Sequence, residues 1–393
     1  MALGMVIHPC APCLHYFSYM QSKSLLAMKP DVAVLTLGAI HLALGVVLPR
    51  DESPTPAKVE PLQPKYFKDL GVQRVRITYG PYLVAGSDVP DTDAMMPCYG
   101  CLVTGYVPDL KFSDDGTSAN ANKNMWLHHI GLMNLNRSAA TCTHRPESIS
   151  VNGNERSPTR KAGYYLGTGD RVMLTTEVMN LAVAPRNVSL TIEWEFLPGT
   201  PDGFDVVTPV WLDARGNCLD EPDGIPANAT IFNATSATGW TAPFAGDLVL
   251  AVPHVHDGSS TGQDVFRDGA LVCRNVPGYG ETSGYITHVP GAGGHHDHGS
   301  DSHVMHVSSI SQCAGLGPVA AGAKFTISSR YNMTAHTPMR TRTGAFEPIM
   351  GIEFLHFARP RDEALAEIRA MKPGNLESFL AQVAALGAKP DWP

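Results

Sequence analysis

Two histidine pairs and one methionine are the residues of this chain best suited to bind a redox metal. His128 and His129 are adjacent, His254 and His256 lie two residues apart, and Met350 follows in a Glu-Pro-Ile-Met-Gly motif. Imidazole nitrogens together with a thioether sulfur suit copper, which cycles between a softer Cu(I) and a harder Cu(II) state. The set therefore predicts a centre of one or two copper ions that activates oxygen. His254, His256 and Met350 are the candidate catalytic residues.

The second pair has the spacing of two ligands on one strand. Side chains two residues apart on a strand point the same way, so the imidazoles of His254 and His256 can reach one ion. The Asp257-Gly258 turn that follows places the pair at a strand end, where functional sites often lie. The alternative is a pair of ordinary surface or core histidines.

The first pair requires a departure from regular strand geometry. Adjacent side chains point to opposite faces of a strand, so His128 and His129 can share an ion only where the strand is bulged or strongly twisted. A further ligand is expected from a second strand, on one face of which Glu177 and Met179 lie. Met179 is the softer donor. The alternative places Met179 in the core and Glu177 in solvent.

Three other groups of residues are weaker metal or redox candidates. His336, flanked by methionines, is an additional candidate ligand. The histidines from His295 to His306 lie among glycines and serines, a composition typical of a mobile loop with loose metal affinity. Cys98 and Cys101 have the spacing of a redox motif, but no βαβ pattern surrounds them, which favours a structural disulfide.

Composition favours a β-rich globular protein. The 393 residues are 44% hydrophobic and 17% charged, with a net charge of −8 and no polybasic stretch, so nucleic acid is excluded as a partner. The 37 glycines and 31 prolines, with short runs of Val, Ile and Thr, indicate many short strands joined by turns. The length allows two domains, each with its own core.

Alternating apolar residues predict two antiparallel β-sandwiches in tandem, of the jelly-roll type. A Pro-rich linker at 51–69 precedes the first sandwich at 70–198, a breaker cluster at 197–203 marks the boundary, and the second sandwich spans 199–360. A short helical tail at 361–393 carries apolar residues at helical spacing on either side of a Lys-Pro-Gly break. The alternation is clearest at 171–179 and 188–196, and further strands are predicted at 74–78, 206–212, 247–252, 270–274, 324–330 and 351–357.

The first 50 residues are expected to be a leader and signal peptide. Their apolar run, 32–48, is short for a membrane span, although a membrane anchor is the alternative. Secretion agrees with the glycosylation sequons and with an even number of cysteines beyond the leader. The sequons are Asn136, Asn187, Asn228, Asn233 and Asn332, and the disulfide candidates are Cys98, Cys101, Cys142, Cys218, Cys273 and Cys313.

The chain resembles the copper type II, ascorbate-dependent monooxygenases, which include peptidylglycine α-hydroxylating monooxygenase and dopamine β-hydroxylase. It is most similar to the stress-up-regulated nodulin-type family and its fungal secreted relatives. The resemblance covers about residues 70–358 and is carried by seven stretches: 97–105, 127–129, 153–156, 177–180, 252–258, 284–286 and 347–351.

The resemblance implies two sandwiches with one copper each, facing one another across a solvent-filled cleft. His128 and His129 would belong to the electron-donating copper. His254, His256 and Met350 would hold the copper where oxygen and substrate meet, and ascorbate or another external reductant would supply electrons.

Two departures from the family pattern matter for function. The third histidine of the electron-donating copper is replaced by Glu177 or Met179. The positions that clamp a substrate carboxylate in the amidating enzyme hold Val252, Ile352 and Phe354, so peptide amidation is not expected.

The sequence thus predicts a secreted copper-dependent monooxygenase that oxidises a C–H bond of a small organic substrate, with secondary-metabolite biosynthesis as one use. One alternative is a non-catalytic extracellular copper-binding or stress-related glycoprotein. A structural glycoprotein without metal is another.

Overall fold

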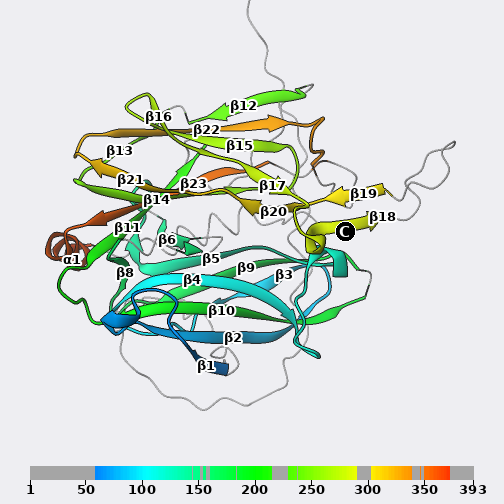
Figure 1. Cartoon of the computed structure of the whole chain (residues 1–393), viewed down its shortest axis with the longest axis horizontal. Helices are drawn as coiled ribbons and strands as arrows, with labels where there is room; N and C mark the ends of the chain where they lie inside the picture. Colours follow the sequence, from blue (N-terminus) through cyan, green and yellow to red (C-terminus); the bar gives the residue numbers. More distant parts are fainter. Residues whose placement is uncertain are drawn as a thin grey trace, which may run out of the picture. The chain divides into compact units, whose positions relative to one another are not determined.

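Alternation of apolar and polar residues produces a strand-rich molecule, as predicted (Figure 1). The computed structural model describes residues 58–143, 145–150, 154–155, 160–182, 184–214, 229–236, 238–289, 302–338, 346 and 349–371. Within these ranges there is one α-helix, α1 (Arg361–Ala370), and three 3-10 turns, η1 (Lys68–Leu70), η2 (Ala121–Lys123) and η3 (Ser283–Tyr285). The all-β fold with a short C-terminal helix is therefore confirmed. Each of the eight predicted strands named above overlaps an observed one.

In the first half, two antiparallel layers enclose a core. One layer contains β1 (Lys58–Leu62), β2 (Gln73–Val84), β10 (Arg186–Pro198), β4 (Cys101–Phe112), β8 (Ala162–Leu166) and the short β7 (Asn154–Glu155). The other contains β3 (Ser87–Asp93), β9 (Val172–Asn180), β5 (Met125–Ser138) and β6 (Pro146–Ser150). Alternate residues of β10, such as Leu190, Ile192 and Trp194, are buried between the layers. The period of two explains why this segment is a strand.

In the second half, two further layers enclose a second core. One contains β11 (Asp205–Asp213), β23 (Gly351–Arg359), β14 (Gly246–Val255) and β21 (Cys313–Val319). The other contains β12 (Ile231–Thr235), β22 (Lys324–Asn332), β15 (Ser260–Arg267), β16 (Ala270–Asn275) and β13 (Trp240–Thr241). Two hairpin-like pairs complete this half: β17 (Pro277–Tyr279) with β20 (Val307–Ile310), and β18 (Ile286–Val289) with β19 (Ser302–Met305). Phe325 and Phe357 lie at the centre of this core.

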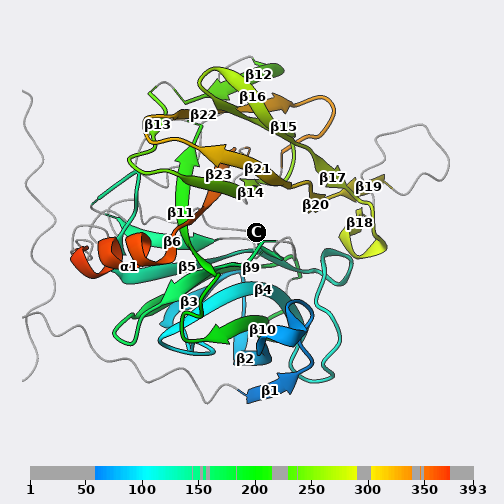
Figure 2. The same ribbon diagram turned by 60° about the vertical axis from the view of Figure 1, so that its left-hand side comes forward.

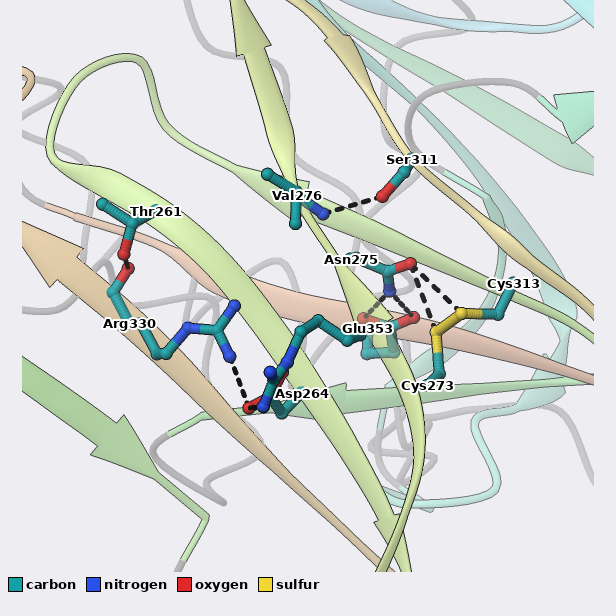
Figure 3. A network of polar contacts seen from close by, with 10 residues as sticks. Thr261, Asp264, Cys273, Asn275, Val276, Ser311, Cys313, Arg330 and Glu353 are labelled. Atoms are coloured by element: carbon teal, nitrogen blue, oxygen red, sulfur yellow. Dashed lines mark hydrogen bonds and ion pairs between the residues drawn. A yellow bond between two sulfur atoms is a disulfide. The ribbon is translucent and has the colours of Figure 1, made fainter.

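A disulfide and a buried polar network tie the layers of the second half together (Figure 3). Cys273 on β16 is bonded to Cys313 on β21, so an edge strand of each layer is linked. Beside it the Asn275 side chain donates to both carboxylate oxygens of Glu353, at 2.9 and 3.2 Å. The Gln263 amide donates to the same carboxyl. Glu353 is fully buried, so these donors are its substitute for water.

The halves are joined by main-chain pairing. β8 of the first half runs parallel to β11 of the second, which makes β1-β2-β10-β4-β8-β11-β23-β14-β21 one continuous sheet. In Figure 2, β11 runs between the two halves. Helix α1 packs beside this joint, where Leu365 joins an apolar cluster with Leu102 and Val206. All described residues belong to a single unit, Asp51–Pro393. The breaker cluster does separate β10 from β11, while the two-domain division at residue 199 stays a prediction.

Most of the cysteines and glycosylation sequons on which the prediction of secretion rests lie among the described residues. Cys98 and Cys101 form a disulfide with each other, Cys142 is also disulfide-bonded, and Cys218 lies outside the described residues. Asn136, Asn187 and Asn233 are exposed, Asn332 is half-buried, and Asn228 lies outside the described ranges. The predicted leader and the second predicted tail helix also lie outside them. No helix among the described residues is long and apolar enough to cross a membrane.

Candidate metal centre

A bulge in β5 turns the first histidine pair toward one point. The pairing of β5 with β9 shifts by one residue between Leu127 and His129, so His128 is the extra residue of the bulge. A bulge re-aims the side chains on either side of it. The predicted condition for a shared ligand pair is therefore met by the observed backbone.

Glu177 of β9 completes this first group. Its Oε2 atom lies 2.9 Å from Nδ1 of His128 and 3.3 Å from Nδ1 of His129. Donor atoms of the three residues all lie within 4.8 Å of one another, close enough to hold one metal ion. Met179 lies on the same face of β9 and is buried. The Glu177 carboxylate, one of the two predicted third ligands, thus lies beside both histidines.

The second pair lies at the end of β14, as its spacing predicts. His254 is on the strand and His256 follows its last residue, Val255. His254 pairs with Ile352 and Val255 with Gly351, the first residue of β23, and Met350 directly precedes Gly351. Met350 packs on the apolar cluster that contains Val252 and Ile352. Its role as a ligand beside the two histidines stays a prediction.

The two histidine pairs meet each other. The ring centres of His128 and His256 are 4.9 Å apart, and those of His129 and His254 are 5.3 Å apart. Within the pairs the ring centres lie 5.1 and 5.8 Å apart. The four imidazoles form one cluster, which we call the histidine cluster. The family resemblance implied two sites across a solvent-filled cleft, and this structure differs because the layers carrying β5 and β14 bring the rings into contact.

Electrostatics of the histidine cluster suit a bound cation. Burial raises the pKa of Glu177, but the neighbouring His128, His129 and His256 outweigh it and hold that pKa well below its usual range. Burial, reinforced by the nearby imidazoles, holds the pKa of His254 well below its ordinary value. His254 is therefore a neutral ring, the form in which histidine binds metals. Imidazole nitrogens suit copper, as they also suit zinc, iron and nickel.

A cavity of about 330 Å³ opens onto the cluster. His128, His129 and His254 form part of its wall. The remaining wall has no Lys or Arg among its described residues and combines apolar with polar side chains. The apolar ones include Val107, Leu110, Leu127, Ile130, Val252, Pro253 and Ile310, and the polar ones include Asp109, Asn120, Tyr285 and Gln312. Such a cavity has the size of a small-molecule site.

Three positions that clamp a carboxylate in the amidating enzyme are apolar core positions here. Val252, Ile352 and Phe354 belong to the same buried cluster on β14 and β23. None of them could donate a charge-assisted hydrogen bond. Their burial supports the expectation of a substrate without a carboxylate at that position.

His336 and the histidine-rich segment behave differently from the cluster. The ring of His336 stacks on Tyr279 with centroids 3.6 Å apart. His303 is exposed on β19, and residues 290–301 lie outside the described ranges. His306, predicted to belong to a mobile loop, is instead buried with 3% exposure, because Asp257 and Thr287 hydrogen-bond both ring nitrogens. That part of the loop interpretation is wrong.

Sequence reasoning missed Asp257, His306 and Trp126, which surround the cluster. Asp257 directly follows His256, and Trp126 precedes His128 by two residues. A charged residue at a strand end beside a ligand pair is a signal that could have identified Asp257. No local pattern marks His306 as its partner.

Comparisons with known proteins point to copper-dependent oxygenases. The chain is 29% identical over 299 residues to a Phoma protein named "Probable copper-dependent oxygenase M1", and the match spans 72% of each chain. It is 29% identical over 254 residues to "Probable copper-dependent oxygenase clz3" of Cochliobolus lunatus, which covers 62% of this chain and 76% of that one.

Two broader comparisons add nothing on function. No family model matches the chain. A solved structure of peptide-N(4)-(N-acetyl-β-D-glucosaminyl) asparagine amidase aligns with a TM-score of 0.32 and 12% identity, covering 73% of this chain and 97% of that one. A similarity of that size does not define a shared fold.

Proposed function

We propose that this protein is an oxidoreductase, a copper-dependent monooxygenase that oxidises a C–H bond of a small organic substrate. The observation that carries the proposal is the meeting of both histidine pairs, with Glu177, at the wall of one cavity. The names of two relatives, each a probable copper-dependent oxygenase, support the same chemistry.

Six side chains would hold copper as two groups of three. His128, His129 and Glu177 form the first group, on β5 and β9. The second group is His254, His256 and Met350, on and beyond the ends of β14 and β23. Copper bound there would supply the one-electron steps of oxygen reduction and C–H oxidation, with electrons from ascorbate or another external reductant.

The protein itself orients the ligands and provides a cavity beside them. The bulge at His128 and the strand end at His256 aim the imidazoles, and burial keeps His254 neutral. Glu177 provides negative charge that offsets a bound cation. Apolar side chains of the cavity wall would contact the nonpolar part of a small organic substrate, and the polar side chains beside them would orient it.

Several finer points belong to the proposal alone. Secretion, glycosylation at the sequons and a role in secondary-metabolite biosynthesis follow from the leader, the sequons and the resemblance. Disulfides among the described cysteines are compatible with an oxidising compartment.

A second candidate function is a non-catalytic extracellular copper-binding glycoprotein. Glu177 in place of the expected third histidine favours it, because a carboxylate stabilises Cu(II) over Cu(I). Counting copper per chain by elemental analysis separates the two functions. Two ions support the monooxygenase, and one supports the binder or a single-copper enzyme.

Reductant-driven oxygen uptake tests the proposal directly. The copper-loaded protein should consume oxygen when ascorbate is added, and His254→Ala and Met350→Ala should each abolish most of this uptake. His336→Phe is a matched control, because it removes an imidazole outside the cluster and keeps an aromatic ring on Tyr279. Uptake that persists unchanged in both cluster variants would overturn the proposal.

A further inference from the structure

A chain of buried side chains connects the backbone segments that carry the two histidine pairs. It begins at Asp257, the residue after His256. Nδ1 of His306 donates to one carboxylate oxygen of Asp257 at 2.8 Å, and the Val307 amide donates to the other at 2.6 Å. Both oxygens are therefore used to hold the segment between β19 and β20 against the end of β14.

The chain continues from His306 to the first half of the molecule. The second ring nitrogen of His306 accepts from the Thr287 hydroxyl at 3.0 Å, which fixes the ring plane. The His306 ring packs on Trp126 of β5 with centroids 5.2 Å apart. Trp126 in turn meets the edge of the His128 ring, with centroids 5.4 Å apart.

These contacts close a ring around the metal centre. The path from His256 through Asp257, His306 and Trp126 ends at His128, whose ring lies 4.9 Å from that of His256. The His306 and Asp257 side chains are 3% and 4% exposed, so solvent does not compete for their hydrogen bond. A buried, fully paired contact of this kind restricts sliding of one strand against the other.

We propose that Asp257 and His306 are positioning residues that set the separation between the two histidine pairs. This inference rests on the proposed function, in that it takes the histidine cluster to be the copper centre. Asp257 fixes the end of β14 at His256, while His306 bears on β5 through Trp126. Neither residue is required to touch the metal. Outer partners of metal ligands commonly change metal affinity by about 10- to 100-fold when removed.

Copper binding and the cupric EPR spectrum of the full chain test the inference. Asp257→Ala and His306→Phe should each weaken Cu(II) binding by about 10- to 100-fold and change the EPR spectrum. The double variant should be no worse than the more damaging single one, because both changes break the same connection. Asp257→Asn keeps the shape and should retain more affinity than Asp257→Ala.

The matched control is Asp268→Asn. Asp268 also accepts a hydrogen bond from a backbone amide, that of Lys324, at 2.9 Å, but it lies at the opposite end of β15. Its variant should keep the copper affinity and the EPR spectrum of the wild type. Circular dichroism and thermal unfolding would identify variants that are folded.

The outcomes separate this inference from the proposed function. Folded Asp257→Ala and His306→Phe proteins with wild-type copper affinity and spectrum would overturn the positioning role. A wild type that binds copper but consumes no oxygen would defeat the monooxygenase while the affinity and EPR comparison still decides the role of Asp257. A wild type that binds no copper would overturn both.

Discussion

The two histidine pairs converge from two strands of different geometry, the bulged β5 and the regular β14. His128 and His129 are adjacent and converge because β5 carries an extra residue there, whereas His254 and His256 need only the ordinary period of a strand. The spacing of two histidines in the sequence therefore does not by itself decide whether both can reach one metal ion. A bulge lets the adjacent pair converge as well as the pair spaced two residues apart.

The third donors differ in a way that makes the two groups chemically unequal. Glu177 adds a hard oxygen beside the first pair, and Met350, proposed as the third donor of the second pair, would add a soft sulfur. A hard donor stabilises Cu(II) and a thioether stabilises Cu(I). If both groups bind copper, the first should be the harder site to reduce.

Of the substitutions considered, His254→Ala should have the largest effect, because it should disturb both ligand groups. His254 contacts both His129 and His256, so His254→Ala takes a donor from the second group and opens a gap beside the first. We expect loss of one copper per chain and a fall in oxygen uptake of more than about 100-fold. Elemental analysis and an oxygen electrode would measure this. Full copper content in the variant would show that the histidine does not bind metal.

Glu177→Gln should affect the first group and leave the second largely intact. The substitution keeps the shape but removes the charge, so Cu(II) binding there should weaken by about 10- to 100-fold. Cu(II) titration by isothermal calorimetry would resolve a weakened step beside an unchanged one. Equal weakening of both steps would mean that the two groups act as one site.

Met350→Leu should have a smaller effect, and one that depends on oxidation state. Leucine keeps the apolar volume next to Val252, so the fold should be retained. We expect Cu(I) binding to weaken by about tenfold, with Cu(II) binding nearly unchanged. Competition with a Cu(I) chelator is the measurement. An unaltered Cu(I) affinity would place Met350 in the core alone.

Glu353→Gln should leave the metal centre unchanged and alter stability only. Burial raises the pKa of Glu353 from its ordinary value of 4.5 to about 8, although Gln263 and Asn275 donate to it. The folded protein then holds a proton that the unfolded chain loses between pH 4.5 and 8, so stability falls as pH rises through this window.

The variant should lose this pH dependence, which amounts to up to about 5 kcal/mol in the wild type. Urea unfolding of the copper-free protein at pH 5 and pH 8 would reveal it. Copper content at a single pH serves as the control. A wild type that is equally stable at both pH values would contradict the prediction.

The strands and the ligand pairs could be predicted because their signals are local. Alternation marks β9, β10 and β22, and the His-x-His spacing marks the end of β14. The bulge could be stated only as a condition, since no residue type signals it in advance. The partnership of Asp257 with His306 could not be predicted, because it joins segments 49 residues apart through packing of the completed layers.

The contact between the two pairs was also beyond the sequence. It depends on how the layer containing β5 faces the layer containing β14, which is set by core packing on both sides of each sheet. The family resemblance suggested a wider separation of the sites. The position of the Glu177 carboxylate beside His128 and His129 likewise required the side-chain positions.

The extra residue at His128 also changes which alternate residues of β5 point into the core: odd-numbered ones before the bulge and even-numbered ones after it. After the bulge, Ile130 and Leu132 are core residues, whereas before it Met125 and Leu127 are. The parity of the strand therefore changes within the histidine pair. Losing or gaining one residue at this point would turn the preceding segment over and carry Trp126 from the cavity side into the core. The length of this stretch is consequently as constrained as its composition, and single-residue insertions or deletions there should be tolerated less well than substitutions.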